Sequence, residues 1–355
     1  MRIVSPFLKN VLYPSLSSAG IFRRTSATGL AIVTYHGVTP EGYEALDAAC
    51  DGNLVTAETL SQQLKLLKAH YSVITPEDML AWREGKYILP PRAVCLTCDD
   101  GLLNNYTDML PVLLEENVKC LFFVTGGSAE GQRTMLWYEE LFLLFLRAPD
   151  GPFEISHDEV AISGVLGARE QRRAAWWSAV KRLSQINATM RISFLEVVRQ
   201  HFGLDARRPL GDEDTVWCRR FGLMTAAELR QMVSAGMTIG AHTMSHPMLS
   251  KLPEAAAYAE IVECKIRLEA ALQKQIWAFA YPFGDAQSVT PQTLAMPEEA
   301  DYKAAFLNYG GGLGSNLPPY ALPRLHVTSE MSLAEFEAHV AGFYGRLQRV
   351  LRRSA

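Results

Sequence analysis

Short apolar segments alternate with amphipathic segments along most of the chain. Residues 30–35 form the first apolar run, and residues 57–70 then place Leu60, Leu64 and Leu67 on one face of a predicted helix. Further strands and helices are predicted at residues 71–75, 76–82, 93–96, 109–116, 119–124, 237–241, 254–272, 276–281 and 320–327. Strands that alternate with helices in this way are typical of a parallel sheet with helical crossovers.

This alternation stops between residues 127 and 220. The stretch contains Trp137, Trp176, Trp177 and Trp217 together with many Arg and Glu residues, and its patterns are helical rather than alternating. We therefore predict a helical insertion of roughly ninety residues with loops. The sequence leaves open whether it acts as a lid, as a substrate wall or only as a structural subdomain.

The overall composition is that of an ordinary globular protein, with 48% apolar and 20% charged residues among 355. We predict an N-terminal helical segment at 1–27, a single α/β domain at 28–345 that carries the insertion, and a basic C-terminal tail at 346–355. The net charge is −4, and no dense basic stripe with interleaved aromatic residues occurs. Nucleic acid is therefore not expected as a partner.

Cysteine usage and the N-terminal residues bear on the compartment. Three of the six cysteines lie in apolar runs, which is typical of a reducing compartment. Cys95 and Cys98 face opposite ways on a predicted strand, so a shared metal or redox role is not expected. Residues 1–24 lack the long apolar centre and the cleavage site of a signal peptide. We expect a cytoplasmic protein, with an N-terminal amphipathic helix that touches a membrane as the alternative.

Residues with catalytic chemistry follow the predicted strands. Asp99 and Asp100 come directly after the apolar run at 93–96. Four histidines lie at or near the ends of other predicted strands: His36, His242, His246 and His326. A single histidine in such a place is more often structural than functional. Because the carboxyl ends of parallel strands meet at one edge, however, we expect these residues to converge.

The spacing of two histidines suggests a metal site. His242 and His246 are four residues apart, so a helical turn or a tight loop brings both imidazoles to one ion. Asp99 or Asp100 would complete a set of two nitrogens and one oxygen. Successive strand side chains point to opposite faces, so one carboxylate can bind the cation while the other moves a proton. Zinc suits this set of ligands, and so does non-haem iron, so the sequence does not identify the metal.

These motifs resemble those of a known family. Residues 97–101, Thr-Cys-Asp-Asp-Gly, are similar to the Thr-Phe-Asp-Asp-Gly motif of the NodB-homology polysaccharide deacetylases, carbohydrate esterase family four. Residues 242–247 resemble their His-Ser/Thr-x-x-His-Pro motif, and residues 35–38 resemble a subgroup associated with bacterial surface-polysaccharide synthesis. The likeness covers residues 28–127 and 220–340. It implies a distorted (β/α) barrel of the polysaccharide deacetylase type.

The resemblance also implies an activity and a role for each motif residue. The enzyme would remove N-acetyl groups from an amino sugar in a glycan, a lipid-linked or a nucleotide-linked saccharide. Asp100, His242 and His246 would hold a divalent metal, usually Zn²⁺, and Asp99 would be the general base. His326 would protonate the departing amine.

The sequence departs from the family pattern beside the base. The Arg-x-Pro-Tyr/Phe motif reads Ala-Tyr-Pro-Phe at residues 280–283, so the arginine that orients the base is absent there. We hypothesise that Arg324, two residues before His326, takes its place. Trp137 either stacks on a sugar or packs in the core. The residues expected to contact substrate are His36, Trp137, Tyr281, Pro282 and Phe283.

Two alternative functions stay open at this point. The same fold would serve to remove another acyl group, such as formyl or an O-acetyl ester. The absent motif arginine also allows a catalytically weak carbohydrate-binding protein that keeps the metal site. The two alternatives differ in their products, because only an enzyme releases an acid or a free amine.

Overall fold

Within the described residues, seven parallel strands form a closed barrel. The structure, a computed structural model, describes residues 6–24, 29–129, 133–211, 215–310 and 317–343. The strands follow the order β1-β10-β9-β8-β7-β4-β3, and pairing of β3 with β1 closes the ring. Their bounds are β1 Leu30–Tyr35, β3 Ala93–Cys98, β4 Cys120–Val124, β7 Thr238–Ala241, β8 Ala278–Ala280, β9 Ala304–Gly310 and β10 Leu322–His326. This confirms the expected (β/α) barrel. A short strand, β2 (Ser72–Val73), pairs with the start of β3 outside the ring.

The strands are buried on both faces, which explains why they read as continuous apolar runs. Every residue of β1, β3 and β4 is buried. Along β3, Val94 and Cys98 belong to the large cluster that packs against the helices. Ala93 and Cys95 belong to a second cluster with residues from most of the other strands. Cys95 and Cys98 therefore lie on opposite faces, as the sequence predicted.

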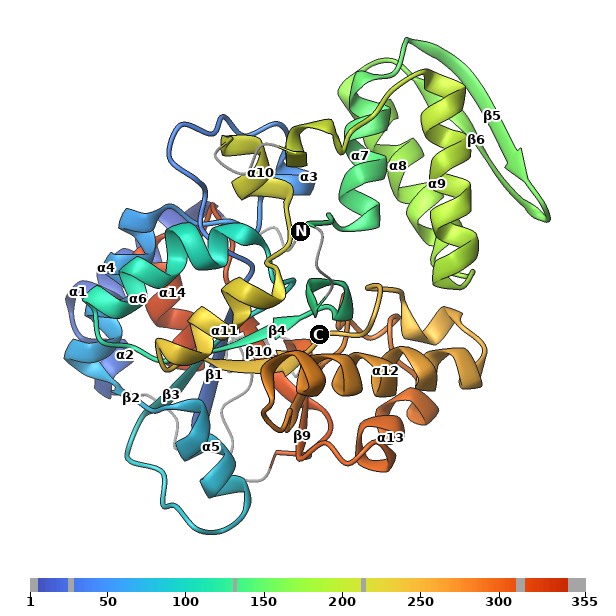
Figure 1. Ribbon diagram of the computed structural model, residues 1–355. Helices are drawn as coiled ribbons and strands as arrows, with labels where there is room; N and C mark the ends of the chain where they lie inside the picture. Colours follow the sequence, from blue (N-terminus) through green and yellow to red (C-terminus); the bar gives the residue numbers. More distant parts are fainter. Residues whose placement is uncertain (1–5, 25–28, 130–132, 212–214, 311–316, 344–355) are drawn as a thin grey trace, which may run out of the picture.

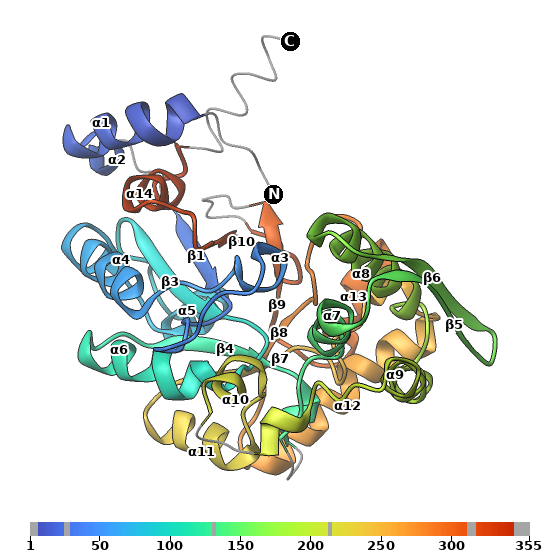
Figure 2. The same ribbon diagram turned by 90° about the horizontal axis from the view of Figure 1, so that it is seen from above.

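Helices cover the outside of the barrel (Figures 1 and 2). These are α4 Ala57–His70, α5 Pro76–Arg83, α6 Leu110–Glu115, α11 Ala226–Ser234, α12 Glu254–Leu272, α13 Pro291–Glu299 and α14 Leu333–Val340. Leu60, Leu64 and Leu67 of α4 are fully buried, which confirms the predicted apolar face. Shorter helices lie in the connections: α3 Ala48–Asp51, η2 Asn105–Met109, η3 Gly126–Ala129, η4 Arg208–Gly211 and η5 Leu249–Lys251.

The segment between β4 and β7 forms a lobe beside the barrel in both views (Figures 1 and 2). The lobe contains α7 Trp137–Arg147, β5 Gly151–His157, β6 Val160–Leu166, α8 Arg169–Leu183 and α9 Ala188–Phe202, and α10 Val216–Phe221 then leads back to the barrel. It has its own apolar cluster. The helical prediction is wrong for β5 and β6, which form an antiparallel hairpin. Buried Phe153 and Ile155 flank exposed Glu154, an alternation too short to stand out among the helical patterns.

The N-terminal elements pack against α14. They are η1 Leu8–Leu12, α1 Tyr13–Ser18 and α2 Ile21–Arg24. The rings of Tyr13, Phe22 and Phe343 contact one another edge to face. Phe7 is 62% exposed and Val11 is 50% exposed. In the part of the chain that the structure describes, no helix is both long and apolar enough to cross a membrane. The predicted basic tail at 346–355 lies outside the described residues.

Two neighbouring leucines on α6 test how this helix packs against the barrel. Leu113 is fully buried, whereas Leu114 is 48% exposed. We expect Leu113→Ala to lower the free energy of unfolding by about 2–5 kcal/mol, because it leaves a cavity between α6 and the barrel. Leu114→Ala on the same helix should change it by less than about 0.5 kcal/mol. Urea denaturation measures both, and equal losses would contradict the assigned helix orientation.

Candidate active site

The predicted functional residues lie at the C-terminal ends of the barrel strands. Asp99 and Asp100 follow β3, and His36 follows β1. His242 follows β7, and His326 is the last residue of β10. Because β1 pairs with both β3 and β10, and β4 joins β3 to β7, the side chains are brought to one end of the barrel.

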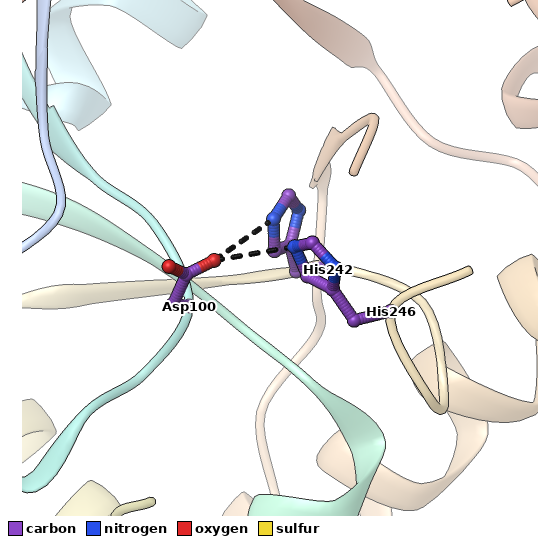
Figure 3. A group of neighbouring side chains, drawn as sticks. All are labelled: Asp100, His242 and His246. Carbon is purple, nitrogen blue, oxygen red and sulfur yellow. Dashed lines mark ion pairs between the residues drawn. The ribbon is translucent and has the colours of Figure 1, made fainter. Parts of the chain in front are cut away.

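Asp100, His242 and His246 form a compact group (Figure 3). The Oδ1 atom of Asp100 lies 3.5 Å from Nε2 of His242 and 3.3 Å from Nε2 of His246. All three residues are buried, at 6%, 1% and 3% exposed. Within the described residues, this is the one group of three or more such side chains whose donor atoms converge, all within 4.8 Å of one another.

The donor atoms fit a divalent metal. Two donors bound at about 2.1 Å with tetrahedral angles lie about 3.4 Å apart, close to the observed spacings. Nδ1 of His242 lies 2.8 Å from the carbonyl oxygen of Ala280, so a proton on Nδ1 leaves the Nε2 lone pair pointing at Asp100. Nδ1 of His246 is buried without a hydrogen-bond partner among the described residues. Two imidazoles and one carboxylate suit zinc and iron alike.

The backbone around this group is strained. Asp100, Thr243, His246 and Phe283 all have left-handed backbone conformations, with φ of 77°, 64°, 55° and 60°. Each such non-glycine residue costs about 1–3 kcal/mol, and such residues cluster at functional sites. The turn is held in part by Thr243, whose Oγ1 accepts a hydrogen bond from the backbone N–H of His246 at 3.0 Å. The strained turn explains how residues four apart in sequence point at one position.

The insertion supports residues 242–247, the loop that carries His242 and His246 and that we call the metal loop. The indole N–H of Trp137 donates to the carbonyl oxygen of His246 at 3.0 Å. Arg191 lies over the Trp137 ring at 4.7 Å and donates to the carbonyl and the hydroxyl oxygens of Ser245, both at 3.2 Å. From the other side, Glu260 of α12 accepts a hydrogen bond from the backbone N–H of Ser245 at 2.8 Å. The sequence analysis did not single out Arg191 or Glu260, which carry no motif.

Asp99 is paired with Arg324. The Nη1 and Nη2 atoms of Arg324 each lie 2.6 Å from one carboxylate oxygen of Asp99, and both side chains are almost completely buried. Arg324 is itself held by the carbonyl oxygen of Leu307 at 2.8 Å and the hydroxyl of Thr97 at 3.1 Å. Burial alone would raise the pKa of Asp99, but the adjacent guanidinium lowers it below its usual value. The geometry is what the hypothesis of a relocated arginine requires.

His36 and His326 stack on each other beside this pair. Their ring centroids lie 4.7 Å apart, and Nε2 of His326 is buried without a partner among the described residues. Burial and the neighbouring His36 lower the pKa of His326 to about 3, so it is neutral in the resting protein. Gly37, the residue after His36, lets the chain pass close to Asn104, because a Cβ there would lie 2.1 Å from Oδ1 of Asn104.

Three of the expected substrate contacts are not supported. Tyr281 is 1% exposed, and its hydroxyl donates to the carbonyl oxygen of Tyr320 at 2.9 Å, so it belongs to the core. Pro282 is also buried. Trp137 is 7% exposed and is covered by Arg191, which agrees with the packing alternative and not with stacking on a sugar. The sequence pattern is apolar in each case and does not distinguish a buried ring from an exposed one.

Phe283 does lie at the site. It is partly exposed, and its ring centroid is 5.0 Å from that of His246 and 5.9 Å from that of Tyr138. The ring of Tyr138 in turn lies 5.0 Å from His246. The sequence analysis missed Tyr138, although it directly follows Trp137 in the chain.

A cavity of about 50 Å³ adjoins the site. His36 and Asp100 line it on the barrel side, and Tyr138, Glu139 and Trp176 line it on the insertion side. The insertion therefore forms a wall of this cavity.

Comparison with known proteins gives the family. The sequence matches the family model described as "Polysaccharide deacetylase" over residues 86–162 and 204–308, just over half of the chain. The chain belongs to the polysaccharide deacetylase family, and the resemblance to the NodB-homology deacetylases is confirmed.

Individual relatives are more distant. The chain is 25% identical over 117 residues to the Bacillus subtilis (strain 168) protein named "Putative polysaccharide deacetylase YxkH", a match to 33% of this chain and 41% of that protein. Among solved structures, it is similar to the Streptococcus pyogenes deacetylase PplD in complex with acetate, with a TM-score of 0.55 and 16% identity over 89% of this chain and 99% of that one. For IcaB from Ammonifex degensii, the TM-score is 0.54 and the sequence identity is 17%, over 89% of this chain and 98% of that one. The solved structures support the fold.

The hydrogen bond from Trp137 to the metal loop leads to a prediction about metal affinity. Trp137→Phe keeps an aromatic ring but removes the indole N–H that fixes His246. We expect zinc affinity to fall about tenfold, as for other groups that orient metal ligands. Competition with a chromophoric chelator measures this. Trp176→Phe is the matched control, because its indole donates to the carbonyl of Tyr138 at 2.7 Å and not to the loop. Equal affinities in the two variants would contradict the supporting role.

The buried ion pair between Asp99 and Arg324 predicts that substitutions of the two residues have non-additive effects on the free energy of unfolding. Arg324→Met leaves the carboxylate of Asp99 buried without a cation, which should lower the free energy of unfolding by about 3–5 kcal/mol. Adding Asp99→Asn removes that charge, so the double variant should be more stable than Arg324→Met alone. Denaturant unfolding of the two single variants and the double variant completes the cycle. A double variant whose loss equals the sum of the single losses would show that the pair is not coupled.

Proposed function

We propose that this protein is a metal-dependent hydrolase that removes N-acetyl groups from an amino sugar within a saccharide. The observation that carries the proposal is the presence of two differently compensated carboxylates at the end of β3. Asp100 faces two imidazoles, whereas Asp99 faces Arg324. Hydrolysis of an amide is favoured by a metal that polarises the carbonyl and by a base that deprotonates the water. This arrangement offers one carboxylate to hold the metal and one to act as the base.

Asp99 would take the proton of the attacking water. Arg324 holds both of its oxygens and favours the ionised form, so the carboxylate is fixed in orientation and ready to accept a proton. Arg324 thereby serves as a positioning residue for the base. If Arg324 serves in this way, the absent motif arginine no longer favours the alternative of a catalytically weak binding protein.

Asp100, His242 and His246 would hold the metal. When bound, a divalent metal lowers the pKa of a coordinated water and polarises the acetyl carbonyl. Burial alone would raise the pKa of Asp100, but the facing histidines hold it well below the usual range, so this residue is available as an anionic ligand. Zinc is the metal that we propose, on the strength of the family resemblance.

His326 would give a proton to the departing amine. An amine leaves poorly until it is protonated, so an acid is required beside the base. Because the low pKa of His326 makes it neutral in the resting protein, the proton that it gives would be the one that Asp99 takes from the attacking water. Its stacking against His36, which lines the cavity, holds the His326 ring in one orientation.

The substrate would be an N-acetylated saccharide used in surface-polysaccharide synthesis. This substrate class rests on the motif at residues 35–38 and on the family, and a glycan, a lipid-linked saccharide and a nucleotide-linked sugar are its three candidate forms. Cys50, Cys95, Cys98, Cys120 and Cys264 are free thiols, which supports a cytoplasmic location. Contact between the N-terminal segment and a membrane remains part of the proposal, with Phe7 and Val11 as the exposed residues.

Acyl release from a panel of saccharides tests the proposal. Metal-stripped, zinc-restored and Asp99→Asn protein would be compared on N-acetylhexosamine glycans and on lipid- and nucleotide-linked sugars. We expect the zinc-restored protein to release acetate and Asp99→Asn to be slower by about 10²–10⁴-fold, the usual contribution of a general base. Asp158→Asn is the matched control, because Asp158 lies in the hairpin turn with its side chain 66% exposed.

The products separate the alternatives. Release of formate, or of acetate from O-acetyl esters only, would replace the proposed reaction by removal of another acyl group. Tight glycan binding without any acyl release would identify a carbohydrate-binding protein. An Asp99→Asn variant as fast as the unchanged protein would remove Asp99 from the mechanism.

A further inference from the structure

The cavity beside Asp100 is lined by a buried ion pair that the proposed reaction does not use. Glu139 of α7 and Arg220 of α10 both line it, together with His36 and Asp100. Nη2 of Arg220 lies 2.9 Å from Oε1 of Glu139, and Nε of Arg220 donates to Oδ1 of Asp51 at 2.7 Å. Arg220 thus ties the start of α7 to α3 and fixes the position of the Glu139 carboxylate.

One oxygen of this carboxylate has no partner. Glu139 is 5% exposed, and its Oε2 atom is buried without a hydrogen bond to any of the described residues. Most buried side-chain polar atoms in native proteins have a partner, so an unpaired one calls for a ligand or a water. Because Oε1 already faces Arg220, Oε2 is the atom that remains for a group bound in the cavity.

The charges around Glu139 determine which kind of group it can bind. The two carboxylates of Glu139 and Asp51 face the single guanidinium of Arg220, which leaves negative charge in excess when both acids are ionised. Burial raises the pKa of Glu139 to about 7, and Arg220 opposes that rise, so the carboxylate is mostly ionised at pH 8. An ionised carboxylate accepts hydrogen bonds and donates none. The cavity therefore favours a group that donates a hydrogen bond and carries no negative charge.

A sugar hydroxyl is the group in the proposed substrate that fits this description. It is neutral, and its O–H forms a short, charge-assisted hydrogen bond with a carboxylate. A phosphate or an acidic substituent would be repelled by the excess negative charge. Because Asp100 lines the same cavity, the hydroxyl would belong to the sugar ring that carries the acetamido group.

We propose that Glu139 is a specificity-determining residue that accepts a hydrogen bond from one hydroxyl of the sugar ring that is deacetylated. Arg220 is the positioning residue that holds the Glu139 carboxylate. The inference rests on the proposed function for the identity of the ligand as an N-acetylated sugar, but the hydrogen bond is measurable without turnover.

The next residue in the chain provides a matched control. Glu140 is also 5% exposed and is also paired with a buried arginine, Arg199, at 3.1 Å, but it does not line the cavity. Glu139→Gln and Glu140→Gln therefore make the same change in the same turn of α7. In Glu139→Gln the amide oxygen replaces Oε1 opposite Arg220, so an N–H donor stands where Oε2 was an acceptor. Thermal unfolding verifies that both variants are folded.

Deoxy sugars test the hydrogen bond. The probes are the methyl β-glycoside of N-acetylglucosamine, its 3-, 4- and 6-deoxy analogues, and the methyl β-glycoside of glucosamine. Calorimetry at pH 8 measures binding to zinc-loaded protein in an Asp99→Asn background, chosen to suppress turnover, and acetate release is measured without that substitution. We expect Glu139→Gln to weaken binding of the parent sugar about tenfold or more, because a hydrogen bond to a charged group is lost. Glu140→Gln should leave the affinity within about twofold.

The analogues complete a cycle between protein and ligand. For one deoxy sugar, Glu139→Gln should cause no further loss, because the hydroxyl that Glu139 would bind is already absent, and that analogue identifies the hydroxyl. An equal loss on every analogue, the same loss in Glu140→Gln, no loss on any sugar or no sugar binding at all overturns the proposal. Tighter, Glu139-dependent binding of the glucosamine glycoside overturns it in favour of a site for the product amine. A Glu139-dependent cycle with no acetate release supports the hydrogen bond and overturns the proposed function alone.

Discussion

Two adjacent carboxylates are buried at the end of one barrel strand, and the rest of the site follows from that constraint. A buried carboxylate that is not compensated is too costly to keep ionised. Asp99 and Asp100 are compensated from different directions, because their side chains diverge after β3. Arg324 reaches Asp99 from β10, and two histidines reach Asp100 from the loop after β7. The folded chain thus already distinguishes the two carboxylates to which we assign the roles of base and metal ligand.

The sequence predicted the parts of this arrangement that depend on local pattern. Buried parallel strands read as apolar runs, and residues that follow them must meet at one edge, so the positions of Asp99, Asp100 and His242 were predictable. The position of Arg324 beside Asp99 was predictable only because the family motif at residues 280–283 lacks its arginine and the strand that carries His326 contains another. The role of Arg191 was not predictable, because a buried arginine in the insertion has no sequence signature. Its partners in the loop are the hydroxyl of Ser245 and the backbone carbonyl of the same residue, and a backbone carbonyl is the same in every sequence.

The aromatic residues are the clearest case in which the sequence does not predict the environment of a side chain. Trp137, Trp177, Tyr281 and Phe283 look alike in a hydropathy profile, yet their environments differ. Tyr281 packs in the core of the barrel, and Trp137 donates to the metal loop. Phe283 is partly buried beside His246, and Trp177 is exposed. For Trp137, Trp177 and Phe283, the environment arises from how the lobe docks on the barrel. That docking depends on contacts between residues far apart in the chain, which periodicity does not encode.

The docking of the lobe also limits how it can move. Trp137 and Arg191 belong to the lobe, and their partners belong to the loop that carries His246. A lid that swung open as a rigid body would break these hydrogen bonds and release the loop. If the proposed metal binds there, metal occupancy and lobe position are thermodynamically linked: a bound ion would favour the docked lobe by the same free energy with which the docked lobe favours the ion. Substrate would enter past a fixed wall, and metal loss would be the event that loosens it.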